Sequence, residues 1–145
     1  MVSFNRTILP NGLRVLVHED RSTPLVAVNV SYYVGSRDEN PEKTGFAHLF
    51  EHLMFSGSKN APDFDNPMQL AGGENNAFTT NDYTTFYEIL PAANIETALW
   101  LESDRMLALN ISRRSLDVQR KVVVEEFKET CLNEPYGDSW HHLSA

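Results

Sequence analysis

The chain contains a single cysteine, Cys131, which excludes an internal disulfide bond. It lacks any run of apolar residues near the length of a membrane-spanning helix, which is about 20 residues. Residues 1–10 lack the charged and then apolar pattern of a secretory signal peptide. We therefore expect a soluble protein, and these features leave open whether it is cytoplasmic or periplasmic.

Basic residues are scarce in this sequence. The 145 residues include 12 Lys and Arg against 20 Asp and Glu, which gives a net charge of -8 and a pI near 5.0. Nucleic acids and anionic membranes attract basic surfaces, so neither is expected as a partner. The hydrophobic content of 41% is typical of a globular protein, and this length supports one domain with one core.

The segment His48-Leu49-Phe50-Glu51-His52 carries the strongest chemical signal in the chain. On a helix, residues four apart project from one face, so His48 and His52 can bind one divalent ion with Glu51 beside them. Zinc suits imidazole ligands, and a hydrolytic zinc site needs three protein ligands and one position for water. Glu51 can then accept the proton of that water.

Apolar residues flank this motif on almost all sides, which predicts a helix that is buried on most sides. Three ionisable side chains inside such a helix would cost on the order of several kcal/mol without partners. A bound metal ion and its water satisfy all three, so the flanking residues favour a metal site. These residues are Phe46, Ala47, Leu49, Phe50, Leu53, Met54 and Phe55.

Turn residues and hydrophobic periodicity divide the chain into strands and helices. Asn11-Gly12 is a hairpin signal between Ile8-Leu9 and a strand from Leu13 to His18, and Leu25 to Tyr33 extends them to three adjacent strands. We expect further strands at 76–80 and 84–90, and helices at 44–55, 65–70, 93–109 and 115–132. These elements predict an α+β fold, with a mostly antiparallel sheet and helices packed on one face.

A third metal ligand must come from another element, and the helix at 115–132 offers Glu125, Glu126 and Glu129. At about 100° per residue, Glu126 falls inside the apolar arc of this helix together with Gln119. Glu125 and Glu129 project toward solvent. Periodicity therefore selects Glu126 and places the metal between this helix and the helix at 44–55. The apolar arc comprises Leu116, Val122, Val123, Val124 and Phe127.

These motifs coincide in order with those of a known peptidase family. The sequence resembles the pitrilysin, insulysin and mitochondrial processing peptidase family, whose inverted zinc motif matches His48 to His52. The resemblance covers essentially the whole chain and includes Glu126. The other matching segments are Leu9-Pro10-Asn11-Gly12-Leu13, Gly45-Phe46-Ala47-His48, Ala71-Gly72-Gly73, Asn76-Ala77-Phe78-Thr79 and Pro135-Tyr136-Gly137.

The resemblance implies a zinc metalloendopeptidase. His48, His52 and Glu126 would hold the zinc ion, and Glu51 would be the general base that activates water. The peptide bond would then be hydrolysed without a covalent intermediate. In this family an extended peptide substrate binds to an edge strand of the sheet and adds to it as a further strand. The segment of this chain that matches that edge strand is Asn76-Ala77-Phe78.

Two departures from the family pattern bear on activity. Many members carry a glutamate where this chain has Gln119, and an amide cannot act as a base there, although it can still hydrogen-bond near the metal.

The family's domain also continues past residue 145, and a second homologous domain, in the same chain or a partner, completes the substrate chamber. We therefore expect residues 1–145 to be the N-terminal part of one zinc-peptidase domain. Such a part would be weakly active alone and would self-associate through exposed apolar surface.

Two alternatives remain open. S-ribosylhomocysteine lyase has a similar fold and helical motif but completes its iron site with a cysteine, which Cys131 could supply. Some subunits of the peptidase family have lost the metal ligands and act as substrate-binding or structural partners, whereas this chain keeps all of them. The adjacent pair His141-His142 predicts at most adventitious metal binding.

Overall fold

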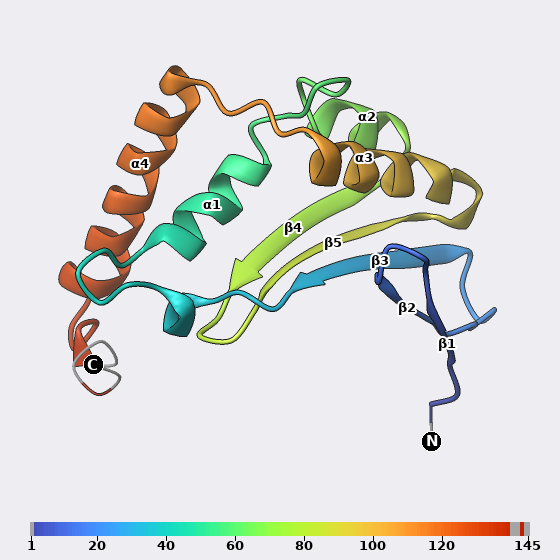
Figure 1. Cartoon of the computed structure of the whole chain (residues 1–145), viewed down its shortest axis with the longest axis horizontal. Helices are drawn as coiled ribbons and strands as arrows, with labels where there is room; N and C mark the ends of the chain where they lie inside the picture. Colours follow the sequence, from blue (N-terminus) through green and yellow to red (C-terminus); the bar gives the residue numbers. More distant parts are fainter. Residues whose placement is uncertain (1, 140–142, 144–145) are drawn as a thin grey trace.

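The structure is a computed structural model that describes residues 2–139 and Leu143. None of the described helices has the length and apolar character needed to cross a membrane. Short 3-10 turns cover Ser36–Asp38 and Ala92–Asn94, and a π-helical turn covers Lys128–Leu132. In chain order (Figure 1), the main elements are β1 (Asn5–Ile8), β2 (Arg14–Val17), β3 (Leu25–Tyr32), α1 (Phe46–Met54), α2 (Asp65–Leu70), β4 (Glu74–Thr79), β5 (Thr84–Pro91), α3 (Ile95–Leu107) and α4 (Arg113–Phe127).

A three-stranded antiparallel sheet has the strand order β3-β5-β4 (Figure 1). β3 pairs with β5 over its full length, from Leu25 opposite Pro91 to Tyr32 opposite Thr84. β4 pairs with the other side of β5, from Glu74 opposite Ile89 onward. β4 is therefore an edge strand of this sheet, as the expected substrate strand must be.

β1 and β2 form a separate antiparallel hairpin, which is closed by the predicted Asn11-Gly12 turn. Gly12 has a φ of 88°, a backbone conformation that favours glycine. The expectation of three adjacent strands is wrong for β3, which pairs with β5 instead. Pairing with β5 lets Val26 and Val28 pack against the hydrophobic core, whereas β1 and β2 are largely exposed.

Helices α1, α2 and α3 pack against one face of the sheet, and α4 packs against α1 (Figure 1). On β5, the side chains of Phe86 and Leu90 point to this face and are buried. The predicted α+β fold with helices on one face is confirmed. The core between sheet and helices comprises Ala61, Phe64, Met68, Ala71, Leu90, Ala98 and Leu101.

The predicted helix boundaries shift by a few residues. α1 begins at Phe46 and not at residue 44, because Gly45 adopts a left-handed conformation with a φ of 91°. The helix expected at 93–109 is regular only from Ile95 to Leu107. The last helix begins earlier than expected, at Arg113, after the hydroxyl of Ser112 caps its N-terminus.

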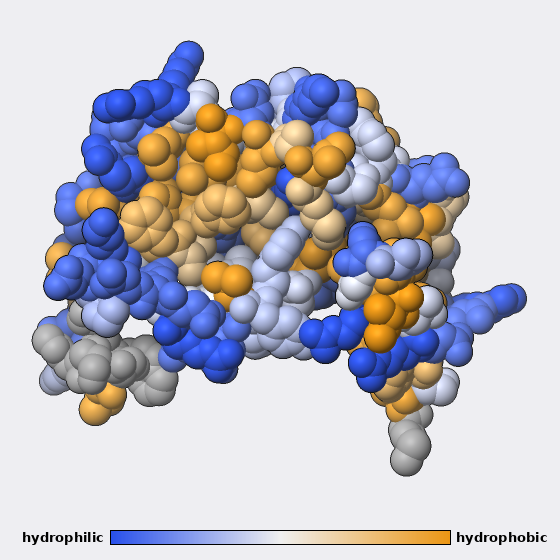
Figure 2. Space-filling model, in the orientation of Figure 1, coloured by the Kyte–Doolittle hydropathy of each residue, from blue (hydrophilic) through white to orange (hydrophobic). Residues whose placement is uncertain are grey.

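α1 and α4 are less enclosed than their sequences predict. On α1, Phe46 and Phe50 remain exposed, because the sheet and α4 cover only its other sides. Figure 2 shows hydrophobic side chains gathered over this part of the molecule. On α4, Leu116, Val124 and Phe127 are exposed, whereas Gln119, Val123 and Glu126 are half-buried. The buried side of α4 is thus narrower than the predicted arc, since α1 is the helix that packs against it.

A charged cluster lies in the core between β5 and α3. Arg105 pairs with Glu102 on its own helix and with Glu88 on β5, and all three side chains are buried. Burial, together with a hydrogen bond to Glu102, raises the pKa of Glu88 to about 9. Glu88 is therefore neutral at pH 7, which leaves one positive and one negative charge in the cluster.

Candidate metal centre

The structure brings His48, His52 and Glu126 together from two helices. His48 and His52 lie one turn apart on α1, and their Nε2 atoms are 3.2 Å apart. Glu126 comes from the last turn of α4, which packs against α1. Its Oε2 atom lies 3.2 Å from Nε2 of His52 and 3.5 Å from Nε2 of His48. The three ligand atoms form a nearly equilateral triangle.

This triangle fits a tetrahedral metal ion. Zinc binds imidazole nitrogens and carboxylate oxygens at about 2.0–2.2 Å, which places neighbouring ligands of a tetrahedron about 3.3 Å apart. The observed separations of 3.2, 3.2 and 3.5 Å match that spacing. The side chains of His48 and Glu126 are 43% and 42% exposed, so solvent reaches the open side of the triangle. The donor set can hold one zinc ion and leave a fourth position for water.

Among the described residues, this triad is the one group of His, Cys, Asp and Glu side chains arranged to hold a metal. Cys131 does not belong to it and contacts the hydroxyl of Thr130 instead, at 3.7 Å. The geometry therefore gives no support to a cysteine-ligated iron site. His141 and His142 lie outside the described residues.

The N-terminus of α1 is held by a carboxylate from the preceding loop. Glu39 accepts hydrogen bonds from the backbone N–H groups of Gly45 and Ala47, at 2.7 and 2.6 Å. These groups have no partner within the helix, and the negative charge also suits the positive end of the helix dipole. Glu39 therefore helps to set the position of the helix that carries both histidines.

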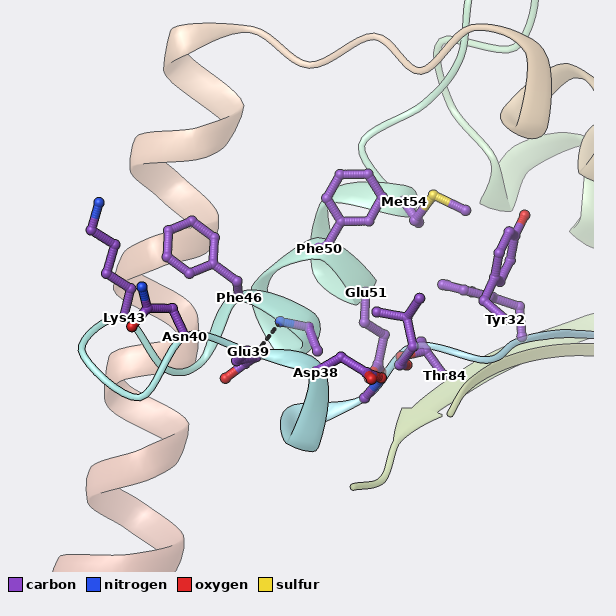
Figure 3. A pocket seen from close by; sticks show the side chains of 14 residues that line it. Tyr32, Asp38, Glu39, Asn40, Lys43, Phe46, Phe50, Glu51, Met54 and Thr84 are labelled. Atoms are coloured by element: carbon purple, nitrogen blue, oxygen red, sulfur yellow. Dashed lines mark hydrogen bonds between the residues drawn. The ribbon is translucent and has the colours of Figure 1, made fainter. Parts of the chain in front are cut away.

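Glu51 projects from α1 into the molecule and is buried. Its Oε2 atom accepts a hydrogen bond from the hydroxyl of Thr79, at 2.5 Å. It also lines a cavity of about 480 Å³ between α1, the loop after β3 and the start of β5 (Figure 3). The cavity is mainly apolar and includes Tyr32, Phe46 and Phe50 in its wall. Glu51 thus lies in the wall of a mainly apolar cavity.

The residues of the expected substrate strand lie on β4 as predicted. Asn76 and Phe78 are exposed on one face of the edge strand, and Ala77 points to the other. The backbone N–H of Ala77 donates to the side-chain oxygen of Asn76, at 2.8 Å. This N–H group is thus held by a side chain of its own strand.

Gln119 lies half-buried on the side of α4 that also carries Val123 and Glu126. No hydrogen bond joins its amide to the triad within the described part of the chain. Thr79 and Glu39 also contribute to the site, and no motif in the sequence predicts either role. Thr79 belongs to the matching segment Asn76-Ala77-Phe78-Thr79, but its contact with Glu51 depends on the packing of α1 against β4.

Residues 14–136 match the profile of the family described as insulinase (peptidase family M16). The chain belongs to this peptidase family. It is 34% identical over 145 residues to an uncharacterized zinc protease of Streptomyces coelicolor, covering 99% of this chain and 31% of that protein. The family assignment confirms the resemblance that the motifs indicated.

Two solved structures of proteases have the same fold. The crystal structure of a protease from Helicobacter pylori superposes with a TM-score of 0.89 and 35% identity, over 94% of this chain and 33% of that chain. Pitrilysin superposes with a TM-score of 0.79 over 88% of this chain and 14% of its own, at 24% identity, which shows a shared fold. The chain spans about a third of the length of the curated relatives it matches.

Proposed function

We propose that the protein containing this chain is a zinc-dependent metalloendopeptidase. The observation that carries the proposal is the triangle of His48, His52 and Glu126, whose edges match a tetrahedral zinc site. Relatives named zinc proteases and the M16 family assignment support the same metal and the same reaction class. When bound, zinc supplies a Lewis acid for the scissile carbonyl and lowers the pKa of water toward neutrality.

Glu51 is the proposed general base. It follows His48 by one helical turn, and its carboxylate is held in place by Thr79. Glu51 accepts a proton from the attacking water and passes it to the leaving amine, so that no covalent intermediate with the protein forms. Its side chain is buried, and the second carboxylate oxygen remains available to accept the proton.

The proposed substrate is an extended peptide that pairs with the free edge of β4. Backbone hydrogen bonds to an edge strand bind a peptide without strict sequence requirements, and alternate side chains contact the two faces of the strand. Asn76, Ala77 and Phe78 are the proposed contacts. A second homologous domain, in the same chain or in a partner, completes the enclosure, and residues 1–145 are the N-terminal part of the metal-binding domain.

Metal content and peptide cleavage of the full-length protein test this function together. We expect one zinc ion per molecule of the parent protein and loss of this zinc in His48→Ala and Glu126→Gln. We expect loss of cleavage in His48→Ala, Glu126→Gln and Glu51→Gln. Glu51→Gln keeps its zinc, because Glu51 is not a ligand. His18→Ala, which removes an exposed histidine bonded to the Ser3 carbonyl, is the matched control and retains both properties.

Two results would contradict the proposal. A parent protein without zinc would favour a non-catalytic, substrate-binding subunit of the same family. A zinc-loaded parent whose cleavage persists in Glu51→Gln would remove Glu51 from the role of general base.

A further inference from the structure

The carboxylate of Glu51 is anchored by one side chain of the edge strand. The hydroxyl of Thr79 donates to Oε2 of Glu51, at 2.5 Å. The other carboxylate oxygen, Oε1, accepts no hydrogen bond from the described residues. Thr79 is the last residue of β4, on the same face of the strand as Ala77. The end of the proposed substrate strand therefore contacts the proposed general base directly.

The hydroxyl hydrogens near Glu51 can be assigned from their acceptors. Thr79 lies 3.2 Å from the hydroxyl of Thr84, its partner across the β4–β5 ladder. Thr84 in turn donates to the backbone carbonyl of Val34, at 3.0 Å. Each hydroxyl carries one hydrogen, and a carboxylate is a stronger acceptor than a neutral hydroxyl. The hydrogen of Thr79 thus goes to Glu51, and Oε2 is occupied while Oε1 stays available.

The position of Thr79 is itself fixed by the neighbouring turn. The backbone N–H of Ser36 donates to the carbonyl of Thr80, and that of Arg37 donates to the carbonyl of Asn81. Arg37 also forms an ion pair with Asp82, at 2.5 Å. The segment after β3 therefore holds the β4–β5 turn from outside. These contacts hold the backbone of the turn that directly follows Thr79.

We propose that Thr79 is a positioning residue for the reaction. Its hydroxyl holds Oε2 of Glu51 and so directs Oε1 toward the water that loses its proton. Thr79 touches neither the metal ligands nor the reacting atoms, and it acts through Glu51. This inference rests on the proposed function, and it adds a specific group on which the efficiency of proton transfer depends.

Thr79→Val in the full-length protein tests the inference, because valine keeps the branched shape and the backbone of β4 but lacks the hydroxyl. We expect kcat to fall about 10- to 100-fold, the effect typical of removing a group that orients a metal-site residue. KM for a peptide substrate and the zinc content remain those of the parent, since the edge strand and the ligands are unchanged. Thr79→Ser, which restores the hydroxyl, recovers most of the lost kcat.

Thr85→Val is the matched control. Thr85 is the neighbouring buried threonine, but its hydroxyl bonds Ser31 on the opposite face of the sheet, at 2.8 Å. This variant also loses a buried threonine hydroxyl, but that hydroxyl does not contact Glu51. We therefore expect its kcat to stay at the parent value. Thr79→Ala provides a second hydroxyl-free variant if Thr79→Val does not fold, with the same expected split between kcat and KM.

Three results would overturn the inference: a parent-like kcat in the hydroxyl-free variants, a serine variant as slow as the valine variant, or a loss of zinc from Thr79→Val. A parent protein that shows no zinc-dependent cleavage would instead contradict the proposed function. The two failures are therefore distinguishable.

Discussion

The guanidinium carbon of Arg105 lies 4.3 Å from the centre of the Phe86 ring, in the core between α3 and the sheet. It lies at the same distance from the ring of Phe64 and at 5.5 Å from the ring of Phe55. The same guanidinium contacts the carboxyl groups of Glu102 and Glu88. A single buried cation is thus enclosed by aromatic faces and carboxyl groups.

Replacing Arg105 with methionine should destabilise the protein severely. Methionine preserves much of the side-chain volume but leaves Glu102 buried without its cation, and removing one partner of a buried ion pair costs about 3–5 kcal/mol. Urea unfolding of the variant and the parent measures this loss. Arg113→Met is the control, because Arg113 is 92% exposed on α4. A loss no larger than that of the control would show that the buried pair does not stabilise the fold.

The pH dependence of stability should report the protonation of Glu88. Burial raises the pKa of Glu88 from 4.5 to about 9, so between these pH values the folded protein holds a proton that the unfolded chain releases. The free energy of unfolding therefore falls as the pH rises through this window. Glu88→Gln does not titrate, and we expect its stability to decline less steeply between about pH 5 and 9.

Unfolding midpoints in urea at several pH values across this window measure the slope for Glu88→Gln and for the parent. Glu96→Gln, at an exposed position on α3, is the control and keeps the parent slope. Equal slopes for Glu88→Gln and the parent would mean that Glu88 titrates at its ordinary pKa.

Glu39→Ala should weaken the N-terminus of α1. The substitution leaves the backbone N–H groups of Gly45 and Ala47 without their carboxylate partner, and the loss of a helix cap costs about 0.5–2 kcal/mol. Glu42→Ala, in the same loop and exposed, is the matched control. Thermal unfolding compares the two variants, and an equal shift in midpoint would exclude a specific capping role for Glu39.

The 145-residue chain on its own should self-associate. Phe46 and Phe50 are 60% and 50% exposed on α1, and hydrophobic side chains gather on the surrounding surface (Figure 2). Sedimentation analysis should give a mass above that of the monomer, and Phe46→Ser combined with Phe50→Ser should lower it. Leu70→Ser, at an exposed position on α2, serves as the control. A strictly monomeric parent chain would contradict the prediction.

Much of the candidate site could be predicted because its signals are local. The spacing of His48 and His52 needs only a helix to place both rings on one face, and the periodicity of the last helix selected Glu126 from three glutamates. The structure brings these three side chains together. The sequence predicts the burial of α1 less well, because Phe46 and Phe50 are apolar but the described residues cover them only in part.

The metal motif, the family and the succession of strands and helices follow from the sequence, since each depends on residue types at short spacing. The pairing of β3 with β5, the hydrogen bond from Thr79 to Glu51 and the contact of Glu39 with the start of α1 depend on tertiary packing. Thr79 and Glu51 are far apart in the chain, and the hydroxyl of any other threonine could in principle donate a hydrogen bond to a glutamate equally well. The choice among them depends on how α1 packs on the sheet, which is a property of the whole core.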